Sequence, residues 1–267
     1  MSHSVRRHLR LEIEAYDKTI RAFIPAYEEM LARAADAVAA TKPKKVIDLG
    51  AGTGALAQAV LQRCEGATVE LIDADAEMLD QARERLAPFA ARVQYAVRAF
   101  QGPLPACDAV VASLALHHVP TLAQKKTIFC AIHAALPPGG VFVNADATMP
   151  ADPSTRQAEY ETWAAHLVSC GIAEERAYSH FAEWSDEDTY FPVEDELAAL
   201  TDAGFAATCL WRVVPVTVIK AAKSATLVSD GLQEGYISLG NSKARATLTT
   251  RPTRIFAKSE STSRDTS

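Results

Sequence analysis

Residues 46–54 constrain the fold most, because an apolar strand pattern there runs directly into three glycines, Val-Ile-Asp-Leu-Gly-Ala-Gly-Thr-Gly. Gly50, Gly52 and Gly54 carry no Cβ, so the backbone can take positive φ or approach a ligand closely. The helix that this loop opens has free N–H groups in its first turn. The pattern predicts a site for a nucleotide-like cofactor, although glycine loops of this kind serve several cofactors.

The bulk composition is that of a globular protein with one principal domain. Of its 267 residues, 49% are hydrophobic and 22% are charged, and the net charge of −6 gives no electrostatic reason to expect nucleic acid. The five cysteines are scattered and show no metal-ligand spacing, so we expect reduced thiols and no metal site. The sequence shows no signal peptide and no apolar run of about 20 residues. We therefore expect a cytoplasmic monomer or homodimer that contacts no membrane.

The first 42 residues predict a helical arm. Apolar residues recur at helical steps from Leu9 to Ala40, with a break at Ile24-Pro25 that divides the pattern into two helices. Such a pair at the entrance to a cofactor loop suits a lid, and it suits a plain packing arm equally well.

Residues 43–223 predict the main domain, because strand and helix patterns alternate after Pro43. This alternation favours a doubly wound α/β sheet that is mostly parallel. In such a sheet ligands bind at the carboxyl ends of the strands. The expected strands are Lys45–Leu49, Thr68–Asp73, Arg92–Ala96, Ala109–Ser113 and Val141–Ala145, and the expected helices are Ala55–Cys64, Ala76–Leu86 and Leu122–Leu136. We expect five residues that follow or end these strands to meet in one crevice: Gly50, Asp73, Ala99, Ser113 and Asp146.

Residues 150–191 form an insertion that is polar and rich in aromatic residues. It fits either a wall over a small substrate or a set of packing anchors. The aromatic residues are Tyr160, Trp163, Tyr178, Phe181, Trp184 and Tyr190.

After the insertion we expect a helix over Glu194–Ala203 and an antiparallel strand pair, Ala206–Trp211 and Val213–Lys220. Residues 224–267 form an extension. Its last part, Lys258–Ser267, has no residue that could anchor it to a core, so we expect disorder there. The stretch Ala225–Ile255 fits a small hairpin or a contact with a second subunit.

Two carboxylates flank the glycine loop. Asp73 ends the second strand, where it is placed either to accept hydrogen bonds from both ribose hydroxyls or to cap the next helix. Asp48 lies inside the first strand, where a carboxylate is costly unless something satisfies it. A ligand amine would do so. NAD remains an alternative, because residues 50–55 also fit the dinucleotide pattern, but a negative Asp48 disfavours a pyrophosphate.

The ordered motifs resemble those of class I S-adenosylmethionine-dependent methyltransferases of the small-molecule type. The resemblance spans roughly residues 40–223. The motifs that carry it are Val46–Gly54, the acid Asp73, Ser113-Leu114-Ala115-Leu116-His117-His118, Leu136-Pro137-Pro138-Gly139-Gly140 and Ala203-Gly204-Phe205. The resemblance implies a Rossmann-like sheet of seven strands, the last of them antiparallel, with S-adenosyl-L-methionine as the cofactor.

The same resemblance implies the cofactor-binding residues. Asp48 would lie near the amino group and Asp73 would hold the ribose. Where family members commonly place an acid for adenine, this chain has Val97-Arg98-Ala99-Phe100, so backbone groups and the Phe100 ring would have to substitute. The complete set is Tyr16, Asp48, Gly50, Gly52, Gly54, Asp73, Ala74, Met78, Ala99, Phe100, Ser113 and Leu114.

The resemblance implies methyl transfer to a small-molecule acceptor by in-line displacement. A general base is needed only where the acceptor keeps its proton, and His117 and Asp146 are the candidates for that role. Each also has a structural interpretation, as a helix cap or a backbone partner. The alternatives are an enzyme that modifies S-adenosylmethionine itself, an NAD-dependent oxidoreductase and a non-catalytic cofactor-binding module.

Overall fold

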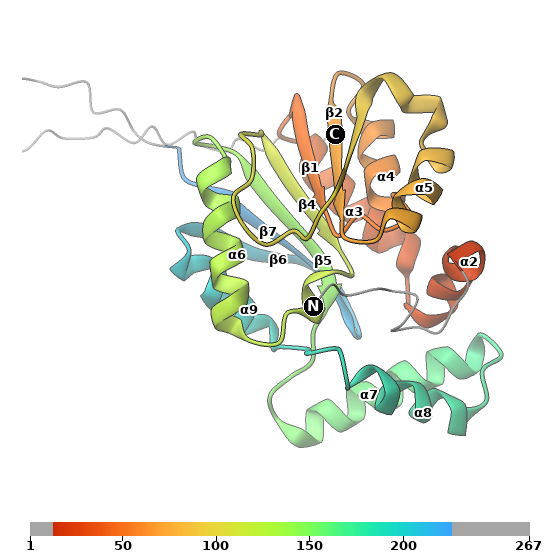
Figure 1. Ribbon diagram of the computed structural model, residues 1–267. Helices are drawn as coiled ribbons and strands as arrows, with labels where there is room; N and C mark the ends of the chain where they lie inside the picture. The colour runs from red at the N-terminus through yellow and green to blue at the C-terminus, as the bar shows by residue number, and fades with distance from the viewer. Residues whose placement is uncertain (1–12, 226–267) are drawn as a thin grey trace, which may run out of the picture. The chain divides into compact units, whose positions relative to one another are not determined.

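The computed structural model describes residues 13–225, and Figure 1 shows them as one sheet with helices around it. Expected and observed elements agree to within a few residues at most ends. The strands are β1 (Lys45–Leu49), β2 (Thr68–Asp73), β3 (Val93–Val97), β4 (Ala109–Ser113), β5 (Val141–Ala147), β6 (Phe205–Val213) and β7 (Val216–Lys223). The α-helices are α2 (Ile13–Phe23), α3 (Tyr27–Ala39), α4 (Ala55–Arg63), α5 (Ala76–Arg85), α6 (Leu122–Ala135), α7 (Pro153–Ser169), α8 (Glu174–Trp184) and α9 (Val193–Asp202).

The seven strands form one sheet in the order β3-β2-β1-β4-β5-β7-β6. The first five run parallel, and β7 pairs antiparallel with both of its neighbours. The Rossmann-like sheet with an antiparallel last strand is therefore confirmed. The chain winds outward in opposite directions from β1 and β4, and ligands bind where the strand order reverses in this way. The glycine loop after β1 lies at this point.

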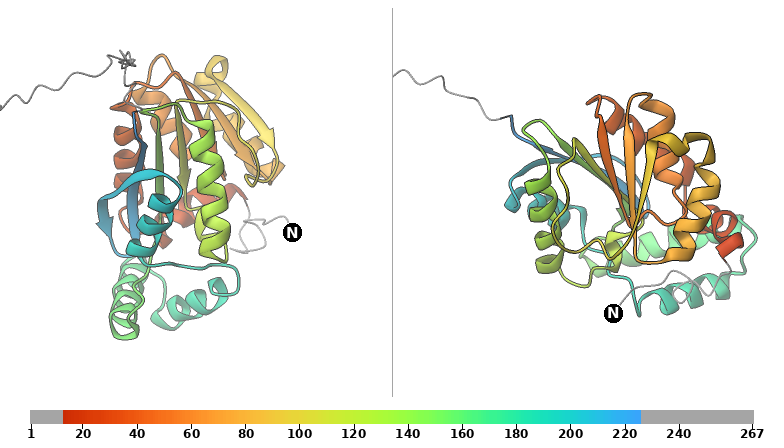
Figure 2. Two further views of the ribbon diagram at one scale, coloured as in Figure 1. Left: turned by 90° about the vertical axis from the view of Figure 1, so that its left-hand side faces the viewer. Right: turned by 45° about the horizontal axis from the view of Figure 1, so that its top comes forward.

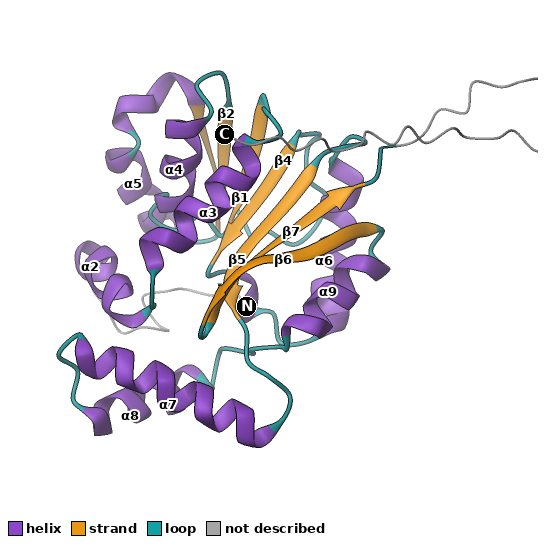
Figure 3. Ribbon diagram, turned by 180° about the vertical axis from the view of Figure 1, so that it is seen from behind, coloured by secondary structure: helices purple, strands orange, loops and turns teal. Residues whose placement is uncertain are grey.

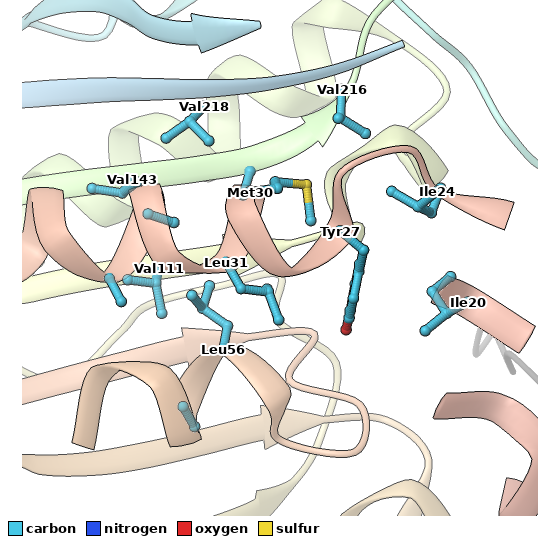
Figure 4. Close-up of a cluster of buried hydrophobic side chains, with 14 of the residues drawn as sticks. Ile20, Ile24, Tyr27, Met30, Leu31, Leu56, Val111, Val143, Val216 and Val218 are labelled. Atoms are coloured by element: carbon cyan, nitrogen blue, oxygen red, sulfur yellow. The ribbon is translucent and has the colours of Figure 1, made fainter. Parts of the chain in front are cut away.

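Two apolar layers cover the sheet. Helices α3, α4 and α5 bury their apolar sides against one face, and α6 and α9 cover the other, as Figure 3 shows. In Figure 4, Met30 of α3 lies toward Val216 and Val218 of β7, while Leu31 points to Leu56 of α4. The residues of β1, β4 and β5 are almost entirely buried between these layers, whereas β3 and β6, at the two edges of the sheet, are partly exposed. Burial on both faces explains why the central strands are continuous apolar runs and do not alternate.

The predicted break in the arm lies between α2 and α3. Proline at residue 25 cannot donate the backbone hydrogen bond of a continuing helix. Ala26 then takes a left-handed conformation with φ 51°, and α3 begins at Tyr27. The helix α3 buries one face, which includes Met30, Leu31 and Val38, so this half of the arm belongs to the core.

The aromatic insertion folds into the helices α7 and α8, and its rings pack on one another. Trp163 lies within 6 Å of Phe181, Trp184 and Tyr190, and its indole N–H donates to the carbonyl of Phe23 at 2.7 Å. In Figures 1 and 2, α7 and α8 lie beyond one end of the strands. Five of the six aromatic side chains thus pack within the insertion, where Trp163 and Trp184 join it to Phe23 of the arm, whereas Tyr178 is exposed.

Two expectations fall outside this description. The disorder of Lys258–Ser267 and the hairpin or subunit contact of Ala225–Ile255 lie beyond residue 225, outside the described part of the chain. Within residues 13–225, no helix has both the length and the apolar character needed to cross a membrane.

Candidate functional site

A cavity of about 660 Å³ opens at the carboxyl ends of β1, β2, β3 and β4. Four of the five residues expected to converge there do so: Gly50, Asp73, Ala99 and Ser113 line it. Residues from the arm, the segment after β4 and the insertion complete the wall. These additional lining residues include Tyr27, His118, Val119, Pro120, Gln124, Asp186 and Glu187.

The glycine loop forms the floor of the cavity, and its three glycines differ in what they do. All three have positive φ. A Cβ on Gly50 would lie 2.6 Å from the Ala115 Cβ, so only glycine fits between the two loops. Gly54 does not line the cavity; it precedes α4, and a Cβ there would press on Ala82, Leu86 and Leu71. Gly54 therefore serves the packing of helix on strand.

Asp73 lines the cavity and also orders the loop. One carboxylate oxygen accepts the backbone N–H of Gly52 and the other accepts that of Asp75, both at 2.8 Å. Burial raises the pKa of Asp73, and these backbone hydrogen bonds oppose the rise. Asp75, rather than Asp73, caps α5 by accepting from Glu77. The capping interpretation of Asp73 is therefore not what the structure shows.

Asp48 is a buried carboxyl of the cavity that lacks good hydrogen bonds. Its side chain is fully buried in β1, and neither oxygen has a hydrogen bond of normal geometry. Burial raises the pKa of Asp48 to about 8; the backbone N–H of Ala57 offsets part of this, and the charge of Asp73 adds to it. A buried carboxyl in this state would be satisfied by a cationic group of a ligand. A pKa of about 8 favours the protonated form of Asp48 at pH 7 in the ligand-free chain, so the charge of Asp48 alone does not disfavour a pyrophosphate.

The charges of the cavity still favour a cationic ligand. Among the lining residues that the structure describes, none is lysine or arginine. The lining includes four carboxylic acids: Asp48, Asp73, Asp186 and Glu187. Of the described lining residues only His118 could carry a positive charge, so a pyrophosphate would meet little basic surface, whereas a ligand with ammonium and sulfonium groups would meet complementary charge.

Three of the four residues expected near the adenine line the cavity, and the fourth does not. Ala74, Ala99 and Phe100 line the cavity. Met78 is fully buried in α5 and does not line it; its Cε would lie 3.4 Å from a Cβ on Gly52, which places it beneath the loop. The ring of Phe100 lies 3.5 Å from the equivalent point on Gly50. That apolar contact from Phe100 replaces the missing acid at the adenine stays a prediction.

Ser113 and Leu114 line the cavity at the end of β4, as expected. Leu114 has φ 49°, an uncommon conformation for a residue with a side chain, and strain of this kind clusters at functional sites. From the arm, Tyr27 is the tyrosine that lines the cavity. Tyr16 lies in α2, and its side chain is outside the described part of the structure.

His117 and Asp146 face each other rather than the cavity. His117 Nδ1 lies 2.5 Å from an Asp146 oxygen, and the second oxygen accepts the backbone N–H groups of Leu116 and His117 at 3.0 Å. Burial lowers the pKa of His117, but the charges of Asp146 and Asp188 outweigh it and raise the value. Burial alone would raise the pKa of Asp146, but the charge and the hydrogen bond of His117 bring that pKa below its ordinary value. This geometry suits residues that hold the segment after β4 in place.

Three lining residues at the open end were not singled out as site residues from the sequence. His118 lines the cavity directly, whereas the expected candidate His117 does not. Asp186 and Glu187 follow α8 and reach the cavity from the insertion. The adjacent His-His pair was visible in the sequence, but no local pattern showed which ring faces the ligand.

A family model described as a methyltransferase domain matches residues 47–142. This match includes the glycine loop, Asp73 and the segment after β4. A trans-aconitate 2-methyltransferase from Mycolicibacterium gilvum is 43% identical over 94 residues. Residues 47–142 form a class I methyltransferase domain. The alignment covers 35% of this chain and 34% of the relative, so the chain spans about a third of that relative's length.

Solved structures share the fold of this methyltransferase domain. An O-methyltransferase family protein from Burkholderia thailandensis aligns with a TM-score of 0.63 and 17% identity, covering 80% of this chain and 60% of that one. Human N-acetylserotonin methyltransferase, solved with S-adenosylmethionine, has a TM-score of 0.53 and 16% identity over 84% and 63% of the two chains. A neocarzinostatin-biosynthesis O-methyltransferase, solved with S-adenosylmethionine and 2-hydroxy-5-methyl naphthoic acid, has a TM-score of 0.50 and 20% identity over 70% and 50%.

Proposed function

We propose that the chain binds S-adenosylmethionine in the 660 Å³ cavity and transfers its methyl group to a hydroxyl group of a small molecule. The observation that carries this proposal is Asp48, a buried carboxyl without a normal hydrogen bond in a cavity that is lined by four carboxylic acids and, among the described residues, by no lysine or arginine. When bound, S-adenosylmethionine supplies a methyl group that its sulfonium has already activated.

The residues of the chain then have two tasks: to hold the cofactor and to place the acceptor. Asp48 holds the amino group of the cofactor, and Asp73 holds the ribose while it fixes the loop through Gly52. Ala99 and Phe100 contact the adenine. The second task is to align the acceptor and exclude water. Proximity and orientation of this kind lower the activation barrier by several kcal/mol.

The acceptor end of the cavity lies next to His118, Asp186 and Glu187. These side chains disfavour an acceptor with several negative charges. The matching relative is named for trans-aconitate, a tricarboxylate, but its similarity is confined to 94 residues. A hydroxylated compound with at most one negative charge fits this chain better, and one structural neighbour was solved with a hydroxylated naphthoic acid.

The test is a melting experiment followed by a transfer assay. S-Adenosylhomocysteine should raise the melting temperature by mass action, and NAD should leave it unchanged. A rise with NAD alone would overturn the choice of cofactor.

Incubation with methyl-labelled S-adenosylmethionine and a panel of phenols and alcohols should then place the label on an acceptor, as mass spectrometry would show. A label that instead appears on a modified cofactor would favour an enzyme that alters S-adenosylmethionine itself.

A further inference from the structure

Three side chains beside the cavity meet in a way that the methyl-transfer proposal does not use. A ring nitrogen of His117, a ring nitrogen of His118 and an oxygen of Asp188 lie within 4.8 Å of one another. His117 and His118 belong to the short helix η2 (Leu116–His118) after β4, and Asp188 belongs to the insertion. We propose that this cluster binds a divalent transition-metal ion such as Zn²⁺.

The distances within the cluster are compatible with three ligands of one ion. The Asp188 Oδ1 lies 2.9 Å from His118 Nδ1 and 3.7 Å from His117 Nε2. Tetrahedral zinc, with bonds of about 2.0–2.2 Å, separates its ligand atoms by about 3.3–3.5 Å. The two observed distances bracket that value, whereas 3.7 Å is too long for a hydrogen bond.

The proton on His117 points to the same conclusion. Its Nδ1 contacts Asp146 at 2.5 Å, so in the neutral ring the proton lies on that nitrogen. The Nε2 atom of the neutral ring then carries a lone pair 3.7 Å from Asp188 Oδ1, and either a proton or a metal ion between the two atoms removes their repulsion. A metal ion would take this lone pair and the carboxylate oxygen together.

Both buried ligands have the outer partners that metal sites require. Metal-binding histidines usually donate their other N–H to a carboxylate, and here Asp146 accepts from His117. A metal-binding carboxylate is itself hydrogen-bonded, and the Tyr190 hydroxyl donates to Asp188 Oδ2 at 2.5 Å, while Oδ1 is the oxygen nearest the two histidines. The backbone is fixed as well, because Thr189 N–H donates to the His117 carbonyl at 2.7 Å.

Two histidines and one carboxylate leave a fourth position for water or substrate. Since His118 lines the cavity, that position would open toward the acceptor end. An ion there would bind the acceptor's hydroxyl oxygen and lower the pKa of that hydroxyl, so that its proton leaves to solvent; the oxygen would then form a bond to the methyl carbon as the S–CH₃ bond breaks and S-adenosylhomocysteine leaves. This role rests on the proposed function, but binding of the ion does not.

The experiment measures Zn²⁺ binding to the full chain, freed of any affinity tag and of metal, by competition with a chromophoric chelator. We expect one Zn²⁺ per chain. Asp188→Asn keeps the size of the side chain and its contact with Tyr190, and His118→Gln removes a ring. Each should weaken binding about 100-fold or more, since even the loss of an outer partner costs about 10- to 100-fold.

The matched control is His166→Gln. His166 lies 3.7 Å from the Cys170 sulfur and could hold adventitious zinc on the surface of the insertion. Its replacement should leave the stoichiometric binding intact. No binding, or binding that survives Asp188→Asn and is lost in His166→Gln, would overturn the proposal.

A melting experiment distinguishes loss of the metal site from misfolding and from failure of the proposed function. Zn²⁺ should raise the melting temperature of the native chain and not that of Asp188→Asn. S-Adenosylhomocysteine should raise both, because Asp188 does not line the cavity. A shift with S-adenosylhomocysteine without one from Zn²⁺ would refute the metal site alone, and the reverse result would refute the methyl-transfer proposal alone.

Discussion

At the scale of single residues, the two carboxyls beside the glycine loop differ in what they already bind. Asp73 accepts two backbone hydrogen bonds at 2.8 Å, whereas Asp48 accepts none of normal geometry. Asp73 thus helps to build the loop before any ligand arrives. The buried carboxyl of Asp48 destabilises the ligand-free chain, and a bound cation would remove this destabilisation.

The first prediction concerns the pH dependence that Asp48 confers. Its pKa is about 8 in the folded chain against 3.8 for the ordinary carboxyl, so the unfolded chain loses this proton first. The ligand-free chain should therefore lose stability as pH rises from about 4 to about 8. Asp48→Asn removes this loss, and its gain in melting temperature over the native chain should grow from pH 5 to pH 8. A gain that is equal at all pH values would contradict the assignment.

Asp48→Asn should stabilise the ligand-free chain but weaken the binding of the ligand. A cationic ligand ionises Asp48, so binding of S-adenosylhomocysteine at pH 7 should release about one proton. Calorimetry in buffers of different ionisation enthalpy measures this release. Asp48→Asn should abolish it and weaken the affinity.

The second prediction concerns Asp73. Asp73→Asn leaves one acceptor oxygen where the carboxylate had two, so either the loop or the ribose loses a partner. We expect S-adenosylhomocysteine to bind about 30- to 100-fold more weakly, which corresponds to about 2–3 kcal/mol. The matched control is Asp75→Asn, which keeps the α5 cap and should hold the affinity to within about 3-fold. Calorimetric affinities that are equal for the two variants would remove Asp73 from the site.

At the scale of elements, the arm is fastened to the cofactor loop by a polar contact. The Thr53 hydroxyl donates to Asp17 of α2 at 2.8 Å, and Asp17 also pairs with Arg85 of α5. The helix α3 is packed into the core, whereas α2 buries Ile20 and Phe23 and makes polar contacts with the sheet domain through Asp17. This division favours a lid role for α2 and a packing role for α3.

The third prediction follows from that contact. Thr53→Val keeps the shape of the side chain and removes the hydroxyl, which should destabilise the docked α2 by about 1 kcal/mol and raise its open population about 5-fold. Hydrogen exchange over residues 17–23 measures this opening. Thr127→Val is the control, because that hydroxyl bonds only within α6, to the Ala123 carbonyl. Equal exchange in both variants would show that the Thr53 contact does not hold the arm.

At the scale of the whole molecule, the cavity belongs to one compact unit. Contacts divide the chain into residues 1–226 and 227–267, and every lining residue lies between Tyr27 and Glu187. The last strand β7 ends at Lys223. The unit of residues 1–226 therefore contains all the described residues that we assign to the cofactor.

The fourth prediction is that a chain ending at residue 226 keeps its affinity for S-adenosylhomocysteine to within about 2-fold, as a domain with its own core should. Calorimetry on the two chain lengths tests this. A tenfold loss would mean that residues 227–267 contribute to the site.

The amino-acid sequence by itself determined the sheet, its parallel order and the place of the cofactor loop. These follow from signals within about ten residues of one another: apolar strand runs, helical spacing and the glycines at Gly50 and Gly52. Five loops were expected to converge, and four of them line the cavity because parallel strands end at one edge. The catalytic roles of His117 and Asp146 stay predictions, and their geometry favours a positioning role.

Only the tertiary structure decided which side chains meet across distant segments. Asp146 binds His117 from 29 residues away, and Trp163 donates to Phe23 across 140. The aromatic residues of the insertion fitted a substrate wall or a set of anchors until their mutual packing was known. Contacts of this kind depend on how helices and strands are placed in space, which no local spacing encodes. For that reason the sequence located the cofactor loop, and the fold alone showed that His118, Asp186 and Glu187 lie opposite it.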